Sequence, residues 1–440
     1  MCMGIEDWGP GQGRLSRRRF IGAGLAAALS AATFGRPNSS GADTLPQAGG
    51  PSTPRILALT GATLYPAPDV PSIARGVVVL KDKTIQAAGT PEEVPIPGDA
   101  QILDCTGLTV MAGFWNCHVH FSRWQGADTL PALQLGRALS AMLTRYGFVR
   151  VVDTGSRLSN TRYLRRRIAS GEVSGPLILT AGSGFAPSGG SPYYIQPARV
   201  PELIDSTGAA TLVDQNLDEG AEVIKLYSGS WSSPDSMVLM PPDVIRAATK
   251  TAHDRGALVL AHPSNSAGAK AAIDGGVDIL AHTFPSPSSG PWDRSLAAQM
   301  TGEGVGLIPT LKLWSYEVRR LSLPSLVGDR ARENAAAQVS AFADRRGQLL
   351  FGTDVGYMSD FDPTDEYVLM KQAGLSFEQI LAALTTGPAA RFGRAAHSGR
   401  VVVGMDAELV VVEGSPKRDI AALARVRYVV REGRIVFDGK

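Results

Sequence analysis

The stretch Leu258–Phe284 reads LVLAHPSNSAGAKAAIDGGVDILAHTF and contains two short apolar runs, each of which ends in a histidine. Between the runs, the segment 267–274 is rich in alanine and is expected to be a helix. Apolar runs of this length, bounded by Gly, Pro and Asn, are typical of strands that are buried on both faces in a parallel sheet. The stretch therefore predicts a strand-helix-strand unit in which His262 and His282 end neighbouring strands.

The same alternation continues on both sides of this stretch. Eight strand-plus-helix units are expected within 113–396, from FWNCHVHF at its start to QLLFGTDVG near its end. The seventh strand is expected over 306–313 with its helix over 330–345, and the last helix over 377–384. This alternation predicts an α/β fold, specifically a (β/α)8 TIM barrel.

The two ends of the chain have a different pattern. Residues 55–112 and 397–440 contain short alternating or apolar runs separated by Gly, Pro and Asp, which is typical of antiparallel strands. We therefore expect a small β-sandwich domain built from both chain ends around the barrel at 113–396.

The first 54 residues predict export. Residues 1–35 contain SRRRF followed by 14 weakly apolar residues at 21–34, which resembles a twin-arginine signal peptide and is too short to span a membrane. Residues 36–54 are rich in Gly, Pro and Ser and read as a disordered linker. The predicted location is the periplasm or the extracellular space, and the alternative is a cytoplasmic protein with a chance basic start.

Composition restricts the partners. The chain has 43 basic and 41 acidic residues in 440, and the leader accounts for the whole excess, so the remainder is neutral. Nucleic-acid binding needs a clear basic excess and is not expected. Three cysteines exclude a disulfide scaffold, and the absence of an apolar run of ~20 residues argues against stable membrane insertion. A small-molecule substrate is expected, and the sequence leaves open a homo-oligomer.

Polar side chains at strand ends indicate a metal site. His118 and His120 are two residues apart on the first strand, so both are expected to point into the barrel, whereas Cys117 and Val119 would face the helices. Lys225, His262, His282 and Asp354 occupy the ends of strands four, five, six and eight. Each residue alone is explained by packing or capping, but together they lie where barrel enzymes place catalytic groups.

These residues resemble the metal ligands of the amidohydrolase superfamily. The resemblance rests on the run Gly113–His120, on Lys225, His262, His282 and Asp354, and on the stretch Leu258–Phe284. The most similar groups are its imidazolonepropionase-related and Xaa-Pro-dipeptidase-like members. Single-metal members lack the lysine, so Lys225 indicates the two-metal branch, in which carbon dioxide converts this lysine to a carbamate.

The resemblance implies a role for each ligand. His118, His120 and Asp354 would hold one divalent ion, His262 and His282 the other, and the Lys225 carbamate would bridge them. Zinc suits imidazole and oxygen donors best, with cobalt, manganese or nickel as alternatives. A hydroxide between the metals would attack the substrate, and Asp354 would move the proton to the leaving nitrogen.

The expected activity is hydrolysis of an amide C–N bond in a dipeptide, an N-acyl amino acid or a cyclic amide. Tyr227, two residues beyond Lys225 on the same face of its strand, is the expected substrate-binding residue, with packing against a loop as its alternative. Two other functions stay open at this point. The same centre would serve an esterase, lactonase or phosphotriesterase, and the scaffold would also serve a non-catalytic binding protein.

Overall fold

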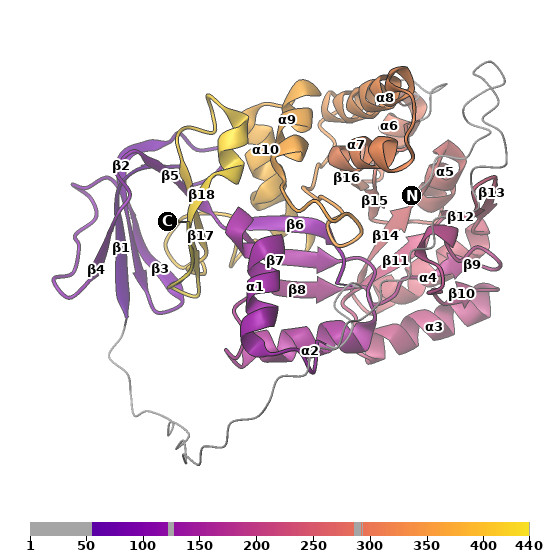
Figure 1. The fold of residues 1–440 in the computed structure, drawn as a ribbon, viewed down its shortest axis with the longest axis horizontal. Helices are drawn as coiled ribbons and strands as arrows, with labels where there is room; N and C mark the ends of the chain where they lie inside the picture. The colour runs from indigo at the N-terminus through magenta and orange to yellow at the C-terminus, as the bar shows by residue number, and fades with distance from the viewer. Residues whose placement is uncertain (1–54, 122–126, 286–291, 293, 440) are drawn as a thin grey trace, which may run out of the picture.

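The computed structural model describes residues 55–121, 127–285, 292 and 294–439. The predicted signal peptide at 1–35 and linker at 36–54 lie outside the described residues. Within the described part of the chain, no helix has both the length and the apolarity needed to cross a membrane. A β-rich unit lies at one end of the molecule, and a larger unit of strands and helices forms the rest (Figure 1).

The β-rich unit is an eight-stranded sheet from both ends of the chain. Its order is β19-β18-β17-β5-β1-β2-β3, and β4 pairs in parallel with β1. The two chain ends meet where β17 pairs antiparallel with β5, with Val411 opposite Val110. The strands are β1 (Ile56–Leu64), β2 (Ile73–Lys81), β3 (Thr84–Gly89), β4 (Gln101–Asp104), β5 (Leu108–Ala112), β17 (Leu409–Glu413), β18 (Val426–Arg431) and β19 (Arg434–Asp438). The two-layer sandwich and the exact domain bounds stay predictions.

The larger unit confirms the α/β class. Its parallel strands form a three-stranded sheet, β6-β7-β8, and a four-stranded sheet, β11-β14-β15-β16. They are β6 (Phe114–Val119), β7 (Phe148–Asp153), β8 (Leu177–Thr180), β11 (Val223–Tyr227), β14 (Leu258–His262), β15 (Ile279–Ala281) and β16 (Gly306–Ile308). Short pairs, β9 (Ala186–Pro187) with β10 (Glu202–Leu203) and β12 (Gly229–Ser233) with β13 (Ser236–Leu239), lie in the connections.

Backbone hydrogen bonds link these two sheets. Phe185, after β8, donates to the carbonyl of Lys225 on β11. The expected eighth strand, QLLFGTDVG, forms only isolated bridges, but Leu350 donates to Leu307 and Cys117 donates to Phe351. The segment 348–354 therefore lies between β16 and β6.

Eleven α-helices occur in the described residues, and several sequence-based bounds hold. They are α1 (Ala132–Met142), α2 (Leu158–Ala169), α3 (Ser206–Asp218), α4 (Pro242–Asp254), α5 (Ser266–Asp274), α6 (Arg294–Gly302), α7 (Leu311–Arg320), α8 (Ser325–Ala343), α9 (Thr364–Gln372), α10 (Phe377–Leu384) and α11 (Thr386–Arg391). The helix expected over 377–384 is confirmed as α10, which starts at a capping box formed by Ser376 and Gln379, and the unexpected short helix α11 follows it.

The strand expected over 306–313 is too long. β16 ends at Ile308, and α7 begins at Leu311, because Thr310 adopts a positive φ of 45° that breaks the extended backbone. The carboxylate of Glu366 accepts hydrogen bonds from the free backbone N–H groups of Leu311 and Lys312. A carboxylate at this position stabilises the helix N-terminus.

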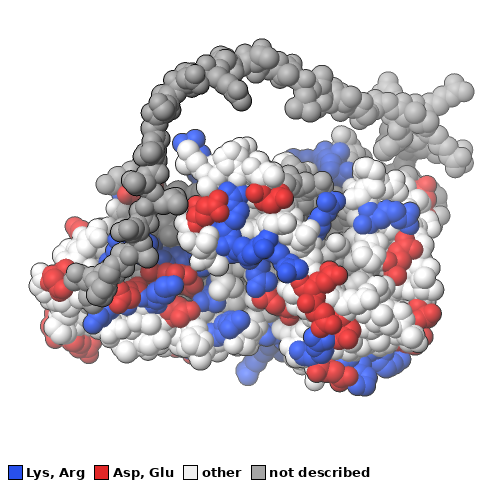
Figure 2. Space-filling view, turned by 90° about the horizontal axis from the view of Figure 1, so that it is seen from below, with Lys and Arg blue, Asp and Glu red and all other residues white. Residues whose placement is uncertain are grey.

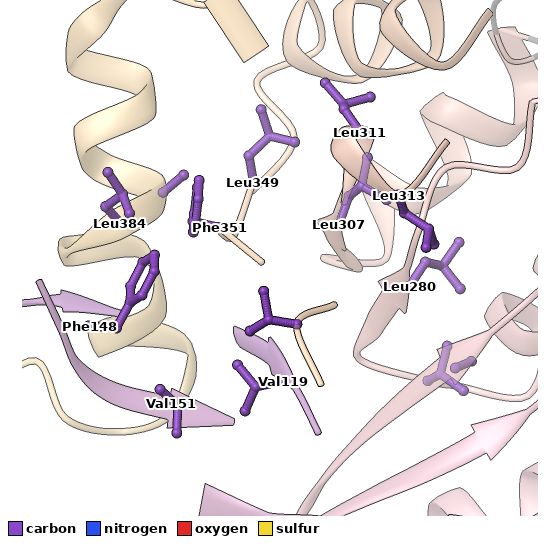
Figure 3. Close-up of a cluster of buried hydrophobic side chains, with 14 of the residues drawn as sticks. Val119, Phe148, Val151, Leu280, Leu307, Leu311, Leu313, Leu349, Phe351 and Leu384 are labelled. Carbon is purple, nitrogen blue, oxygen red and sulfur yellow. The ribbon is translucent and has the colours of Figure 1, made fainter. Parts of the chain in front are cut away.

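The parallel strands contribute side chains to two separate apolar clusters, here called the outer layer and the inner cluster. Figure 3 shows part of the outer layer, where Phe148 and Phe351 of the strand layer pack near Leu384 of α10. The inner cluster takes members from each of the seven parallel strands and from the segment 348–354: Trp115, Cys117, Val152, Leu179, Ala181, Val223, Leu260, Ile279, Ile308 and Leu350. Each of these strands therefore contributes to one shared cluster.

The expected direction of Cys117 is wrong. Val119 packs in the outer layer as predicted, but Cys117 packs in the inner cluster. The pairing of β6 with β7 shifts in register between Asn116 and Val119, and such an irregularity interrupts the alternation of side chains along a strand.

A buried ion pair joins the two units. Arg150 on β7 donates from Nε to Glu408 and from Nη2 to Asp406, both at 2.6 Å, and its guanidinium lies over the ring of Trp115. The side chains of Arg150 and Glu408 are 4% and 6% exposed. Elsewhere, basic and acidic side chains lie beside one another over the face in Figure 2, as the neutral composition predicts.

Replacement of Arg150 by methionine is expected to lower the free energy of unfolding by about 3–5 kcal/mol, because it leaves Glu408 buried without a cation. The double variant Arg150→Met/Glu408→Met is expected to regain most of this loss. Urea denaturation of the three proteins provides the measurement. An unchanged midpoint for Arg150→Met would show that the pair does not hold the two units together.

Candidate functional site

All six predicted metal ligands lie beyond the carboxyl ends of the parallel strands or within their last three residues. His118 and Lys225 lie within β6 and β11, and His262 ends β14. His120, His282 and Asp354 follow β6, β15 and the segment 348–353 directly. Because parallel strands end at a common edge, these side chains come from distant parts of the chain and still meet.

The structure brings the four imidazole rings and one carboxylate together. Ring centroids are 5.2 Å apart for His118 and His120, 4.5 Å for His118 and His282, and 4.9 Å for His262 and His282. Oδ1 of Asp354 lies 2.9 Å from Nε2 of His120 and 3.5 Å from Nε2 of His118. The structure thus brings these five side chains from separate strand ends into one place.

The site is buried and contains polar atoms that lack partners. The exposed fraction is at most 5% for His118, Lys225, His262, His282 and Asp354. Nδ1 of His118 is buried without a hydrogen bond to any described residue, and the one described atom within hydrogen-bond distance of the buried Oδ1 of Asp354 is Nε2 of His120. Unpaired buried polar atoms are costly, so their presence indicates a bound group with which they interact.

Hydrogen bonds fix which nitrogen of each ring is free. Nδ1 of His120 lies 2.8 Å from the carbonyl of Gly155. A carbonyl only accepts, so Nδ1 carries the hydrogen, and the neutral ring presents the lone pair of Nε2 to Oδ1 of Asp354. Two lone pairs at 2.9 Å repel unless a proton or a metal cation lies between them. The adjacent carboxylate raises the pKa of His120 although burial acts in the opposite direction.

The same argument applies to the histidines that end β14 and follow β15. The hydroxyl of Thr310 donates to the carbonyl of Pro309, so it accepts a hydrogen bond from Nδ1 of His282. The hydroxyl of Ser264 donates to the carbonyl of Gly229, so it accepts from Nε2 of His262. The free nitrogens are therefore Nε2 of His282 and Nδ1 of His262. Such partners orient histidine ligands in metal sites.

The backbone at this edge adopts a conformation that side chains usually avoid. Positive φ angles occur at Ser264, His282, Thr310 and Asp354, with values of 57°, 75°, 45° and 62°. Each such residue costs about 1–3 kcal/mol, and residues of this kind cluster at functional sites.

Burial favours the neutral form of three of the four imidazoles and of the Lys225 amine. It lowers the pKa of His118, His262 and His282 well below the usual value, and their mutual repulsion with Lys225 adds to this. Burial also lowers the pKa of Lys225 to about 7, although Asp354 opposes it. No described residue forms a hydrogen bond or an ion pair with the amine of Lys225. Neutral imidazoles and a neutral amine are the states that metal binding and carbamate formation require.

The donor set fits divalent cations. The ligand atoms of His118, His120 and Asp354 lie within 4.8 Å of one another, which suits one ion. His262 and His282 provide only two donors for a second ion, so that position needs a further ligand. Lys225 lies close enough to lower the pKa of both rings, and a lysine amine becomes an anion when it forms a carbamate. Imidazole and carboxylate donors are typical of zinc sites.

Tyr227 ends β11 at the same edge of the sheet. It is 8% exposed, and its ring centroid is 5.4 Å from that of His262 and 5.9 Å from Nζ of Lys225. Burial raises the pKa of its hydroxyl, which keeps it protonated as a hydrogen-bond donor. Its role toward substrate stays a prediction. The sequence pattern places Ser264 at the mouth of the site, two residues past His262, and the structure shows it as the partner of that ring. Sequence reasoning missed Thr310 and Gly155, since a ring's partner depends on loop geometry.

The chain is similar to known hydrolases over most of its length. Aspergillus niger ochratoxinase is 22% identical over 88% of this chain and 87% of the relative. Imidazolonepropionase of Syntrophobacter fumaroxidans is 22% identical over 82% of this chain and 89% of the relative. A Xaa-Pro dipeptidase structure with bound methionine in its active site superposes with a TM-score of 0.75 at 21% identity, covering 87% of this chain and 100% of that one.

The family comparison covers most of the chain. Residues 109–436 match the amidohydrolase family, and the matched range includes the six predicted metal ligands together with β6–β18. The chain belongs to the amidohydrolase family and is a hydrolase of amide or other C–N bonds.

Proposed function

We propose that this enzyme hydrolyses the amide bond of a dipeptide, an N-acyl amino acid or a cyclic amide with two divalent metal ions. His118, His120 and Asp354 would hold one ion, and His262 and His282 the other, with Lys225 between them as a carbamate. The observation that carries this proposal is the buried convergence of the four imidazole rings, with Oδ1 of Asp354 2.9 Å from Nε2 of His120 and 3.5 Å from Nε2 of His118.

The metal ions and the side chains of the site would have different roles in this reaction. Divalent ions held there would lower the pKa of coordinated water from ~15.7 toward ~7 and polarise the scissile carbonyl. Asp354 accepts the proton of the attacking water and returns it to the leaving nitrogen, as a general base that becomes a general acid. Tyr227 donates its hydroxyl hydrogen to a carbonyl or carboxylate oxygen of the substrate. The burial of the site excludes bulk water and strengthens these interactions.

The names of the relatives support the substrate class. One similar structure is a Xaa-Pro dipeptidase, whose name describes cleavage of dipeptides, and it covers nearly the whole folded chain.

We also infer that the two parallel sheets close through the segment 348–354 into an eight-stranded barrel. The inner cluster with members from every strand supports this closure. We further propose export through the twin-arginine leader, which cell fractionation with an Arg17→Lys/Arg18→Lys leader variant would test.

Lys225→Met is expected to stabilise the metal-free protein. The unfolded lysine titrates near 10.5 and the folded one at about 7. The penalty is therefore fully present below pH 7 and disappears as the pH rises to 10.5. Urea denaturation of chelated protein should show Lys225→Met more stable than wild type by on the order of 3 kcal/mol at pH 7, with a smaller gap at pH 9.5. An equal or lower stability at both pH values would show that the amine is not buried as described.

Activity is expected to require both metal and Lys225. Zinc-loaded protein with bicarbonate should hydrolyse members of a panel of dipeptides and N-acyl amino acids. Chelation should abolish turnover, and zinc or cobalt should restore it. Lys225→Ala should lose at least 100-fold in kcat, since it lacks the proposed bridge. The exposed His253→Ala is the matched control and should retain activity.

The same panel separates the alternatives. Turnover confined to esters, lactones or phosphotriesters would replace amide hydrolysis by that activity. Metal binding without turnover of any class would favour a binding protein, and a fully active Lys225→Ala would contradict the two-metal assignment.

A further inference from the structure

Asp153 is a buried carboxylate that the proposed chemistry does not use. It ends β7 and is 0% exposed. Among the described residues, no lysine or arginine pairs with it, and its hydrogen-bond donors are neutral. Its Oδ1 accepts from the hydroxyl of Ser156 and from the backbone N–H of Gly155, and its Oδ2 accepts from the hydroxyls of Thr161 and Thr180. A buried charge held only by neutral donors is costly, so its position needs an explanation.

The two oxygens of Asp153 hold different parts of the structure. The Oδ2 side contacts Thr161 of α2 and Thr180 of β8, which belong to the scaffold. The Oδ1 side contacts only Gly155 and Ser156, which form the loop that follows β7. Asp153 therefore fixes this loop relative to the scaffold.

The loop in turn holds His120 from two directions. The carbonyl of Gly155 accepts the hydrogen bond from Nδ1 of His120 and so determines that Nε2 is free. The hydroxyl oxygen of Ser156 accepts from the backbone N–H of Phe121, the residue after His120, at 2.7 Å. Both the ring and the backbone of His120 are thus connected to Asp153 through one intermediate residue each.

The close approach of the loop supports the same conclusion. A Cβ atom added at Gly155 would lie 3.1 Å from Nδ1 and Cε1 of His120, which is tighter than most Cβ contacts. The backbone N–H of Thr154 also donates to the carbonyl of Val119. The segment 154–156 therefore packs along 119–121 as a support for His120.

We propose that Asp153 is a positioning residue that fixes the ring of His120 for metal binding through Gly155 and Ser156. This inference rests on the proposed metal-dependent function. Residues that orient a metal ligand without touching the metal alter metal affinity by about 10–100-fold when they are replaced. A residue with a purely structural role changes stability and leaves the affinity of the folded protein unchanged.

Cobalt binding by the whole protein tests this. Affinity is measured by competition with a chelator, and the visible absorption spectrum of bound cobalt reports the ligand geometry. Folded fraction and Tm are recorded for every variant. Asp153→Asn and Ser156→Ala are expected to weaken cobalt binding 10–100-fold and to change the spectrum. Ser156→Ala is the milder change and keeps the test valid if Asp153→Asn does not fold.

Two matched controls separate positioning from stability. Thr161→Val removes a donor from the Oδ2 side only, and Glu408→Gln alters a carboxylate that is also buried but lies beyond the other end of β7, next to Arg150. Both controls should lower Tm and keep the cobalt affinity and spectrum of wild type. If Ser156→Ala also keeps them, the positioning role of Asp153 is overturned while metal binding by wild type stands. If wild type itself binds no cobalt, the proposed function fails and the inference fails with it.

Discussion

The central constraint on this structure is the burial of several titratable nitrogens in one site, because burial makes their charged forms unfavourable. Four imidazoles and an amine are packed into one site, and burial favours the neutral form of three of those rings and of Lys225. Neutral nitrogens with oriented lone pairs repel one another unless a cation lies among them. This constraint links the fold to the function, since the same burial that destabilises the empty arrangement prepares it to bind metal.

The surrounding residues orient the histidine rings in the same manner at three positions. Each of three histidines has one ring nitrogen bonded to a fixed acceptor, namely the carbonyl of Gly155, the hydroxyl of Ser264 or the hydroxyl of Thr310. Positive φ angles at the strand ends turn ligand and partner into reach of each other. Stability is thereby reduced locally, and packing of the two apolar layers around the strands compensates for it.

Much of this could be predicted from the sequence, and the exceptions have physical causes. The convergence of distant histidines followed from one rule, that parallel strands end at a common edge. α10 was predictable because its capping residues are local. The direction of Cys117 was not, since a register shift in β6 depends on the neighbouring strand. The role of Thr310 was hidden as well, because a φ of 45° at a threonine has no local signal.

Anomalous X-ray diffraction from crystals grown with zinc and bicarbonate tests the central claim most directly. The account predicts two zinc peaks per chain, one beside His118, His120 and Asp354 and one beside His262 and His282. It also predicts extra density on the amine of Lys225, continuous with both. A single peak, or an unmodified Lys225 with no metal nearby, would contradict it.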